Sequence, residues 1–344
     1  MERLSLYFTG PYQLEIREES LASPASDQVL VQTLLSAVSP GTEMLVYRGQ
    51  TPPGMAIDDT IGALAGEFGY PLKYGYAAVG RVMALGSKVE KVWRDRVVFA
   101  FHPHESHFLA NPADLMPVPD AITPETAALL PSMETAISFL MDGQPTIGEQ
   151  VAVFGQGIVG LLTAALLAQL PLASLVTLDH YPLRRDWSRR LGAHATLDPA
   201  RPDLLDKLHH HLQGDRPYRG ADLAYELSGN PQALDQAIAA TGFNGRIVVG
   251  SWYGQKQASL NLGGRFHRSH MRLISSQVSH IAPRWRGRWS KDRRLQQAWA
   301  MLARGFLDSL ITHRFPFSHA SQAYQLLHQN PQETIQVVLT YDQY

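Results

Sequence analysis

A glycine-rich turn between an apolar strand and an apolar helix constrains this chain more than any other feature. The run VAVFGQGIVGLLTAALLAQL, residues 151–170, has the spacing G-x-G-x-x-G and is followed by SLVTLDH. In this pattern the first glycine permits a tight turn, the second admits a pyrophosphate and the third lets helix and strand pack closely. The N-terminus of the helix also favours phosphate. The segment predicts a dinucleotide-binding βαβ unit, rather than a structural turn, with cofactor contacts at Gly155, Gln156, Gly157, Ile158, Val159 and Gly160.

The end of the second strand indicates which dinucleotide is bound. Asp179 follows that strand, and a carboxylate there accepts both ribose hydroxyls and repels a 2′-phosphate. NAD is therefore favoured. NADP stays open, because Arg184 comes soon after and can stack on adenine or bind that phosphate. Two further cofactor contacts are expected where later strands end, at Ser228 and Gly250.

Composition limits the classes of protein that fit. The 344 residues suit two domains, and the net charge of −1 argues against a nucleic-acid or membrane partner. The chain has no cysteine, which excludes disulfides and every zinc site that needs Cys. The N-terminal residues show no signal-peptide pattern, so we expect a cytoplasmic protein. The most apolar window, residues 158–176, is interpreted as the helix after the glycine turn and not as a membrane span.

The order of strand and helix patterns predicts an α/β fold in two parts. Residues 1–120 contain β-branched or alternating runs separated by Gly and Pro. Residues 121–275 alternate strands with helices, which implies a doubly wound parallel sheet with right-handed crossovers. Residues 276–344 hold two helical patterns and a last strand, IQVVLTY.

Taken together, these segments resemble the medium-chain dehydrogenase/reductase superfamily of alcohol and threonine dehydrogenase relatives. The resemblance rests on PGTEMLVYRG, YGYAAVGRV, DRVVF, the glycine fingerprint, ADLAYELSGNPQALDQAI and LITHRFPFSHASQAYQLL. It implies a GroES-like catalytic domain (1–120 and 276–344), a Rossmann domain (121–275), and an active site in the cleft between them. It also implies a small-molecule substrate, a homodimer or homotetramer, and Thr135 under the nicotinamide. The stretches YPLKYGYAAVGRV and LISSQVS are similar to the bacteriochlorophyllide 3-hydroxyethyl dehydrogenase branch.

The departures from this family concern its catalytic zinc. Zinc-dependent members have Cys before G-T-D, where this chain has Pro40, and G-H-E, where it reads Gly75-Tyr76-Ala77. The third ligand position falls near Pro131, and the four-cysteine structural lobe is absent. These residues do not reproduce a tetrahedral site. We therefore expect no zinc and no other metal site.

A site without zinc needs other groups to stabilise negative charge on oxygen. Tyr76 replaces the His ligand, and its hydroxyl either acts as a general acid or merely fills the space of the metal. Thr42 occupies the family's proton-relay position, although a threonine that caps a turn is an alternative. Glu43 occupies the position of a carboxylate that orients the site, and a structural ion pair is the favoured interpretation.

Two further segments carry candidate groups. The loop FAFHPHESHF has H-x-H-x-x-H spacing, and its His102 and His104 are candidate catalytic residues. The segment HIAPRWRGRWSKDRR, residues 280–294, interleaves Arg with Trp. It suits a planar anionic ligand, although a solvated surface loop is the favoured interpretation.

Three functional hypotheses follow. The first is a zinc-independent oxidoreductase that transfers hydride between a nicotinamide cofactor and a carbonyl or alcohol carbon. Its substrate is bulky and anionic if the Arg/Trp segment lines the cleft. The second is an NADPH-dependent quinone or enoyl (C=C) reductase, which Asp179 disfavours. The third is a non-catalytic dinucleotide-binding protein.

Overall fold

The computed structural model describes residues 1–212, 220–305 and 307–341. The chain divides into two compact units. The first comprises Met1–Pro131 with Gln296–Tyr344, and the second comprises Ser132–Leu295. The second unit is thus an insertion into the sequence of the first.

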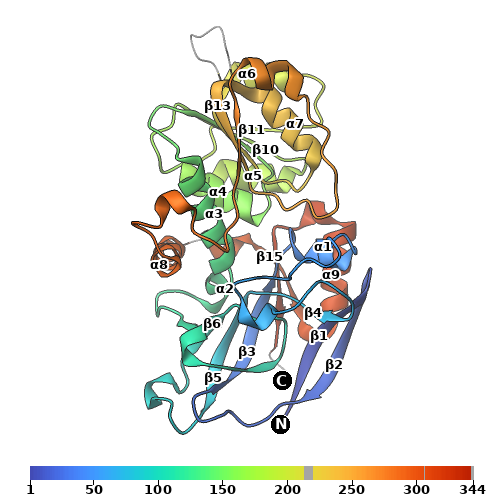
Figure 1. The fold of residues 1–344 in the computed structure, drawn as a ribbon, viewed down its shortest axis with the longest axis vertical. Helices are drawn as coiled ribbons and strands as arrows, with labels where there is room; N and C mark the ends of the chain where they lie inside the picture. The colour runs from blue at the N-terminus through green and yellow to red at the C-terminus, as the bar shows by residue number, and fades with distance from the viewer. Residues whose placement is uncertain (213–219, 306, 342–344) are drawn as a thin grey trace. The chain divides into compact units, whose positions relative to one another are not determined.

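The first unit is built on two sheets. A three-stranded sheet has the order β2-β1-β4, and a seven-stranded sheet has the order β15-β16-β3-β5-β6-β8, with β7 paired to β3. β16 runs antiparallel to β3 and aligns Val337 with Val38, so the C-terminal segment completes a sheet that the N-terminal segment begins (Figure 1). The strands are β1 (Glu2–Gly10), β2 (Gln13–Ser20), β3 (Val29–Val38), β4 (Leu72–Lys73), β5 (Ala78–Leu85), β6 (Val97–Ala100), β7 (His107–Ala110), β8 (Leu115–Pro117), β15 (Ile311–Pro316) and β16 (Gln336–Thr340).

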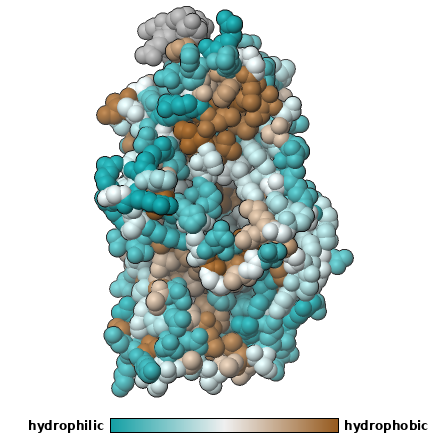
Figure 2. Space-filling view, in the orientation of Figure 1, coloured by the Kyte–Doolittle hydropathy of each residue, from teal (hydrophilic) through white to brown (hydrophobic). Residues whose placement is uncertain are grey.

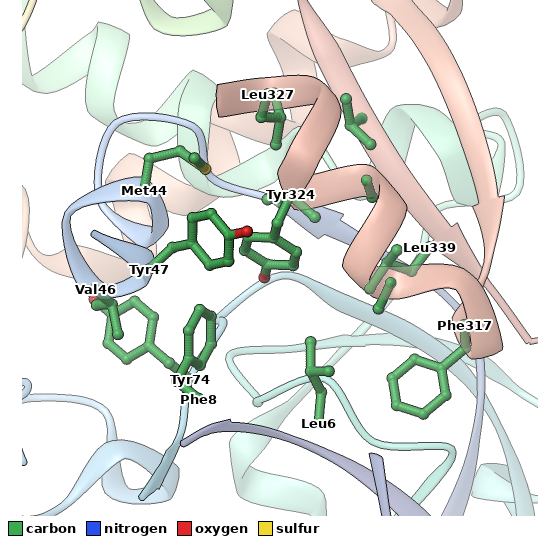
Figure 3. Packing of buried hydrophobic residues seen from close by; sticks show 14 of the residues in the cluster. Leu6, Phe8, Met44, Val46, Tyr47, Tyr74, Phe317, Tyr324, Leu327 and Leu339 are labelled. Carbon is green, nitrogen blue, oxygen red and sulfur yellow. The ribbon is translucent and has the colours of Figure 1, made fainter. Parts of the chain in front are cut away.

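Helix packing in this unit follows from the spacing of its apolar residues. Its helices include α1 (Glu43–Tyr47), α2 (Pro124–Ala127) and α9 (Ala320–Gln329). In α9 the buried residues are Ala320, Ala323, Tyr324 and Leu327, which recur three or four positions apart and so share one face. Figure 3 shows this face packed against residues of β1, α1 and β16.

The second unit is a parallel sheet with helices in its crossovers. Its six strands have the order β11-β10-β9-β12-β13-β14, and every neighbouring pair is parallel. The strands are β9 (Gln150–Phe154), β10 (Ser174–Leu178), β11 (Ala195–Leu197), β12 (Ala221–Glu226), β13 (Thr241–Val249) and β14 (Arg272–Ser275). The helices α4 (Ile158–Leu167), α5 (Pro182–Arg190), α6 (Leu204–His211) and α7 (Pro231–Ala240) lie in the crossovers. Two more helices, α3 (Leu130–Gly143) and α8 (Lys291–Leu302), span the boundaries between the units.

This strand order confirms the predicted doubly wound α/β class. The chain reverses its direction of travel across the sheet between β9 and β12. In such sheets ligands bind at this switch point, outside the carboxyl ends of the strands. The GroES-like assignment of the first unit stays a prediction. Across the described ranges, no helix is long and apolar enough to cross a membrane.

Candidate active-site and cofactor-site residues

The three glycines of the fingerprint meet different surroundings. Gly155 has φ +92°, and a Cβ there would lie 2.6 Å from the Cα of Ser228. A Cβ on Gly160 would lie 2.0 Å from the carbonyl oxygen of Gly155, so the start of α4 packs directly on the turn. Gly157 has nothing within 4 Å of its Cβ position. The close contacts therefore require glycine at 155 and 160, while the face at 157 is open to a ligand.

The carboxylate of Asp179 is fixed at the end of β10. Its Oδ2 accepts a hydrogen bond from the backbone N–H of Gln156 at 2.7 Å, and its Oδ1 accepts one from Tyr181 N–H at 2.9 Å. Arg184 Nη1 lies 3.9 Å from Asp179 Oδ2, and its guanidinium stands over the Tyr181 ring. Burial lowers the pKa of Arg184. The structure thus brings together three of the predicted residues, Gln156, Asp179 and Arg184.

A second carboxylate at this edge of the sheet was not predicted from the sequence. Glu226, the last residue of β12, is fully buried and accepts hydrogen bonds from the backbone N–H and hydroxyl of Ser228, at 2.8 and 2.5 Å. Tyr253 donates its hydroxyl to Glu226 at 2.5 Å. The sequence did contain a signal for Glu226, because it is an acidic residue at the carboxyl end of a predicted parallel strand.

The remaining predicted cofactor residues have mixed surroundings. Ile158 and Val159 begin α4, and Thr135 lies half-buried in α3. A Cβ on Gly250 would lie 2.3 Å from the Phe139 ring, so packing accounts for this glycine.

In the first unit, three hydroxyls meet near the start of α1. Tyr76 donates to Ser39 Oγ at 2.5 Å and lies 3.5 Å from Thr42 Oγ1. All three residues are partly exposed. Burial of the phenol raises the pKa of Tyr76, so the hydroxyl keeps its proton. The structure brings Tyr76 and Thr42 together, as the family motifs suggested. Ser39 is the third residue of this hydroxyl cluster, and no motif in the sequence indicated it.

Glu43 lies buried directly behind these hydroxyls. Its Oε1 accepts the backbone N–H of Ser39 at 2.8 Å, and its Oε2 accepts from the hydroxyl of Tyr324 in α9. Oε2 also lies 3.0 Å from Nε2 of His104, and neither side chain of that pair is exposed. Glu43 is thus held in a buried structural network whose members include His104 and Tyr324.

The other ring nitrogen of His104 continues this network. Its Nδ1 lies 2.7 Å from Ser36 Oγ, which lies 2.9 Å from the hydroxyl of Tyr341. Gly75 has φ +119°, and a Cβ there would lie 2.7 Å from the His104 ring. The imidazole is thus enclosed, and Glu43 is the residue that lies between it and the backbone of Ser39.

His102 points into a different environment. Its ring stacks on Phe108 with centroids 4.0 Å apart, and Nδ1 lies 3.7 Å from Glu105 Oε2. Glu105 is also bound by Arg3 and Lys73 at 3.0 and 2.5 Å. Burial lowers the pKa of His102 to about 4. The H-x-H-x-x-H spacing therefore does not converge on one site.

The Arg/Trp segment is only partly a solvated loop. Arg286, Arg288 and Arg293 are exposed, whereas Arg294 is 1% exposed. Arg294 donates to Glu134 Oε1 from Nε and Nη2, at 3.0 and 2.8 Å, and to Ser138 at 2.7 Å. The expectation of a wholly solvated segment is wrong for this residue, because a buried carboxylate compensates its charge.

Comparisons with known proteins agree with this fold. A family model described as zinc-binding dehydrogenase matches residues 159–302. The D-guloside 3-dehydrogenase of Escherichia coli K12 is 24% identical over 355 residues, covering 98% of this chain and 99% of the relative. The 2-desacetyl-2-hydroxyethyl bacteriochlorophyllide A dehydrogenase of Cereibacter sphaeroides is 25% identical over 349 residues, covering 96% of each.

Solved structures superpose over nearly the whole chain. A short chain alcohol dehydrogenase from Escherichia coli CFT073, in complex with NADH, has a TM-score of 0.79 at 18% identity and covers 99% of both chains. The 2R,3R-butanediol dehydrogenase of Bacillus subtilis also has a TM-score of 0.79, at 17% identity, covering 99% of this chain and 100% of that one. The fold and the relatives define an oxidoreductase. Residues 159–302 match the zinc-binding dehydrogenase family, and the chain is similar over nearly its whole length to named dehydrogenases, which confirms the resemblance.

Proposed function

We propose that this chain is a metal-independent, NAD-preferring dehydrogenase that interconverts a carbonyl and an alcohol. In this proposal the first unit is the catalytic domain and Tyr76 is the group that stabilises the substrate oxygen. The observation that carries the proposal is the hydroxyl cluster of Tyr76, Ser39 and Thr42, supported from behind by Glu43. A nicotinamide cofactor supplies or accepts the hydride when it is bound.

The cluster has the properties of an oxygen-stabilising group. The Tyr76 phenol is held by Ser39, and its raised pKa keeps it protonated at neutral pH. A protonated hydroxyl can donate to an oxygen on which negative charge develops. Thr42 provides a second hydroxyl, which can return a proton to Tyr76 after Tyr76 has donated its own to the substrate oxygen. Glu43 fixes the backbone of Ser39, so the position of the cluster does not depend on mobile side chains.

The donor groups present do not fit the zinc that the family's description implies. Pro40 and Ala77, at two of the expected ligand positions, have no side-chain donor atom. Glu43 and His104 are already engaged with each other and with buried hydroxyls. Within the described ranges, no group of three His, Cys, Asp or Glu side chains is placed to hold a metal ion. No step of the proposed reaction uses a metal.

The glycine turn, Asp179 and the Glu226–Ser228 pair would hold the cofactor. Asp179 supports NAD, because its fixed carboxylate would repel a 2′-phosphate. A relative structure from Sinorhizobium meliloti is described as bound to NADP and another as complexed with NADH, so the family accommodates both. Asp179 is the residue on which the preference in this chain would depend.

The substrate proposal is a secondary alcohol or the corresponding ketone. Named relatives act on a guloside, sorbitol and L-threonine, and each name describes a dehydrogenase. An anionic substrate stays a prediction. It is supported by Arg286, Arg288 and Arg293, which have no carboxylate partner among the residues described here.

A dimer is proposed through the edge of the parallel sheet. β14 is an edge strand, and Leu273 on it is 37% exposed, with Phe243 and Leu262 also exposed at 47% and 43%. Figure 2 shows apolar side chains gathered around this strand. An apolar edge strand is suited to pairing with a second copy. Sedimentation of the wild-type chain should give a dimer or tetramer, and Leu273→Lys should shift it toward monomer.

The test of the proposed reaction is nicotinamide turnover with purified protein of measured metal content. We expect the protein to oxidise secondary alcohols with NAD. It should do so when the purified protein contains only trace zinc, on the order of 0.1 zinc ion per chain or less. Ketones and enones should be assayed in parallel. Stoichiometric zinc whose removal abolishes activity would contradict metal independence. Turnover of enones but not of ketones would favour the C=C reductase instead.

A further inference from the structure

A pocket of about 420 Å³ lies on the first unit between the β1–β2 hairpin, α1 and α9, and its lining includes no residue of the hydroxyl cluster. Its lining includes Tyr12, Gln13, Glu15, Tyr47, Ser321 and Gln325. Its volume falls in the range of small-molecule sites.

An exposed aromatic ring forms one wall. Tyr12 has φ +63°, in the left-handed region that a tyrosine rarely adopts, and is 51% exposed. Its backbone N–H donates to the carbonyl of Tyr47 at 2.6 Å, and its ring contacts those of Tyr47 and His328 with centroids 5.4 and 5.1 Å apart. The strained backbone thus holds an apolar ring face open to solvent. Such strain is associated with binding sites.

A hydroxyl on a largely buried tyrosine faces the same pocket. Tyr47 is only 4% exposed, yet its hydroxyl makes no hydrogen bond to any residue in the described parts of the chain, and it lines the pocket. Burial raises its pKa, so it is a protonated donor. Figure 3 shows the Tyr47 ring reaching from α1 toward α9, beside Tyr324. A hydroxyl that faces a pocket and has no protein partner is available to a ligand.

Apart from Leu14, the remaining lining is polar, and it carries no positive charge. The amides of Gln13 and Gln325 and the hydroxyl of Ser321 are exposed in this lining. Glu15 contributes a carboxylate, which pairs with Arg17 at 2.7 Å. Amides and hydroxyls around an aromatic face suit a molecule with several hydroxyl groups and a C–H face. The absence of a cation in the lining disfavours a phosphate or carboxylate.

We propose that this pocket binds a neutral polyhydroxylated molecule, a sugar or polyol, at a site separate from the catalytic hydroxyls. The ring of the ligand stacks on Tyr12, and its hydroxyls bond to Tyr47, Gln13 and Gln325. This assignment does not rest on the proposed reaction, since it uses no residue of the hydroxyl cluster.

Saturation-transfer NMR titrations with sorbitol and methyl β-D-glucoside test the proposal, with glucose 6-phosphate as the charged comparison. We expect dissociation constants on the order of 1 mM, as is usual for a ligand of about a dozen heavy atoms. Tyr47→Phe should weaken binding about fivefold through one lost hydrogen bond. Tyr12→Gly should weaken it roughly tenfold. Glycine relieves the strain at this position, so misfolding is not expected.

The matched controls separate this pocket from the catalytic site. Gln322 is exposed on α9 outside the pocket, and Gln322→Ala should bind like wild type. Tyr76→Phe should also keep the binding, because Tyr76 does not line the pocket. The proposal is overturned if Tyr12→Gly and Tyr47→Phe bind as tightly as wild type. It is equally overturned if glucose 6-phosphate binds more tightly than the neutral sugar, or if no transfer is seen at 50 mM, about fifty times the expected constant.

Discussion

The hydroxyl of Tyr324 donates to the carboxylate of Glu43, and the two residues are 281 positions apart in the chain. Tyr324 belongs to α9, whereas Glu43 begins α1. Through Glu43 this hydrogen bond supports Ser39 and therefore Tyr76. The proposed catalytic cluster of the N-terminal segment thus depends on the C-terminal segment.

Glu43→Gln should destabilise the protein strongly. The carboxylate of Glu43 accepts from the Ser39 N–H and the Tyr324 hydroxyl and pairs with His104, and an amide would turn an NH₂ group toward at least one of these donors. The free energy of unfolding should fall by about 2–4 kcal/mol, measured by urea denaturation. Tyr324→Phe, which removes a single hydroxyl, should cost about 1–2 kcal/mol. Equal stability of Glu43→Gln and wild type would show that the network is not energetically important.

Tyr76→Phe should remove most of the activity while leaving substrate binding almost intact. A group that donates to developing charge contributes about 10²–10³-fold to kcat and little to KM. The control is Tyr74→Phe, two residues earlier, whose ring is buried at 4% exposure. It should keep near-normal kcat.

Because the pKa of Tyr76 is raised above 10, ketone reduction should lose no activity from deprotonation of this group up to about pH 10. An unchanged kcat in Tyr76→Phe would leave the residue a packing role only.

Asp179→Ser should shift the cofactor preference toward NADP. The substitution removes the charge that opposes a 2′-phosphate, and it leaves Arg184, whose Nη1 lies 3.9 Å from the carboxylate. The ratio of kcat/KM for NAD over NADP should fall by roughly 10–100-fold. Asp186→Asn, an exposed position on α5, is the charge-matched control and should not alter the ratio. Preference of the wild-type enzyme for NADPH would contradict the assignment of Asp179.

Stability should decline as the pH falls from about 6.5 to about 4 because of His102. Its folded-state pKa is lowered to about 4 by burial, whereas an unfolded histidine titrates near 6.5. Within this window the unfolded chain binds a proton that the folded chain does not, which favours unfolding by up to about 3 kcal/mol. His102→Phe keeps the stacking on Phe108 and should flatten the dependence. Urea midpoints between pH 4 and 7 measure the effect, with His267→Gln, which is exposed, as control. The same slope in both variants would exclude His102 as its source.

The parts of the structure that local sequence dictates were predictable. The glycine turn, Asp179 and the alternation of strands and helices lie within short windows, and backbone geometry alone explains them. Thr42 and Tyr76 were predicted as candidate site residues because the family motifs mark their positions. These predictions used only local spacing or motif alignment.

The missed features depend on partners far away in the sequence. Nothing near Arg294 indicates that Glu134, 160 residues earlier, compensates its charge. Ser39 has no local signal, since a serine before a turn is common. His104 was grouped with His102 by spacing, whereas its partners come from β3 and α1. Charge and spacing identify which side chains are reactive, and only the fold decides which of them meet.

The insertion of residues 132–295 into the first unit has a consequence for biosynthesis. A chain made from its N-terminus has all six strands of the parallel sheet before β15 and β16 are synthesised. Until α9 and β16 leave the ribosome, Glu43 has no tyrosine partner and β3 lacks one neighbouring strand. The nucleotide-binding unit can therefore fold during translation, while the unit with the proposed catalytic hydroxyls is completed only after the last strand emerges.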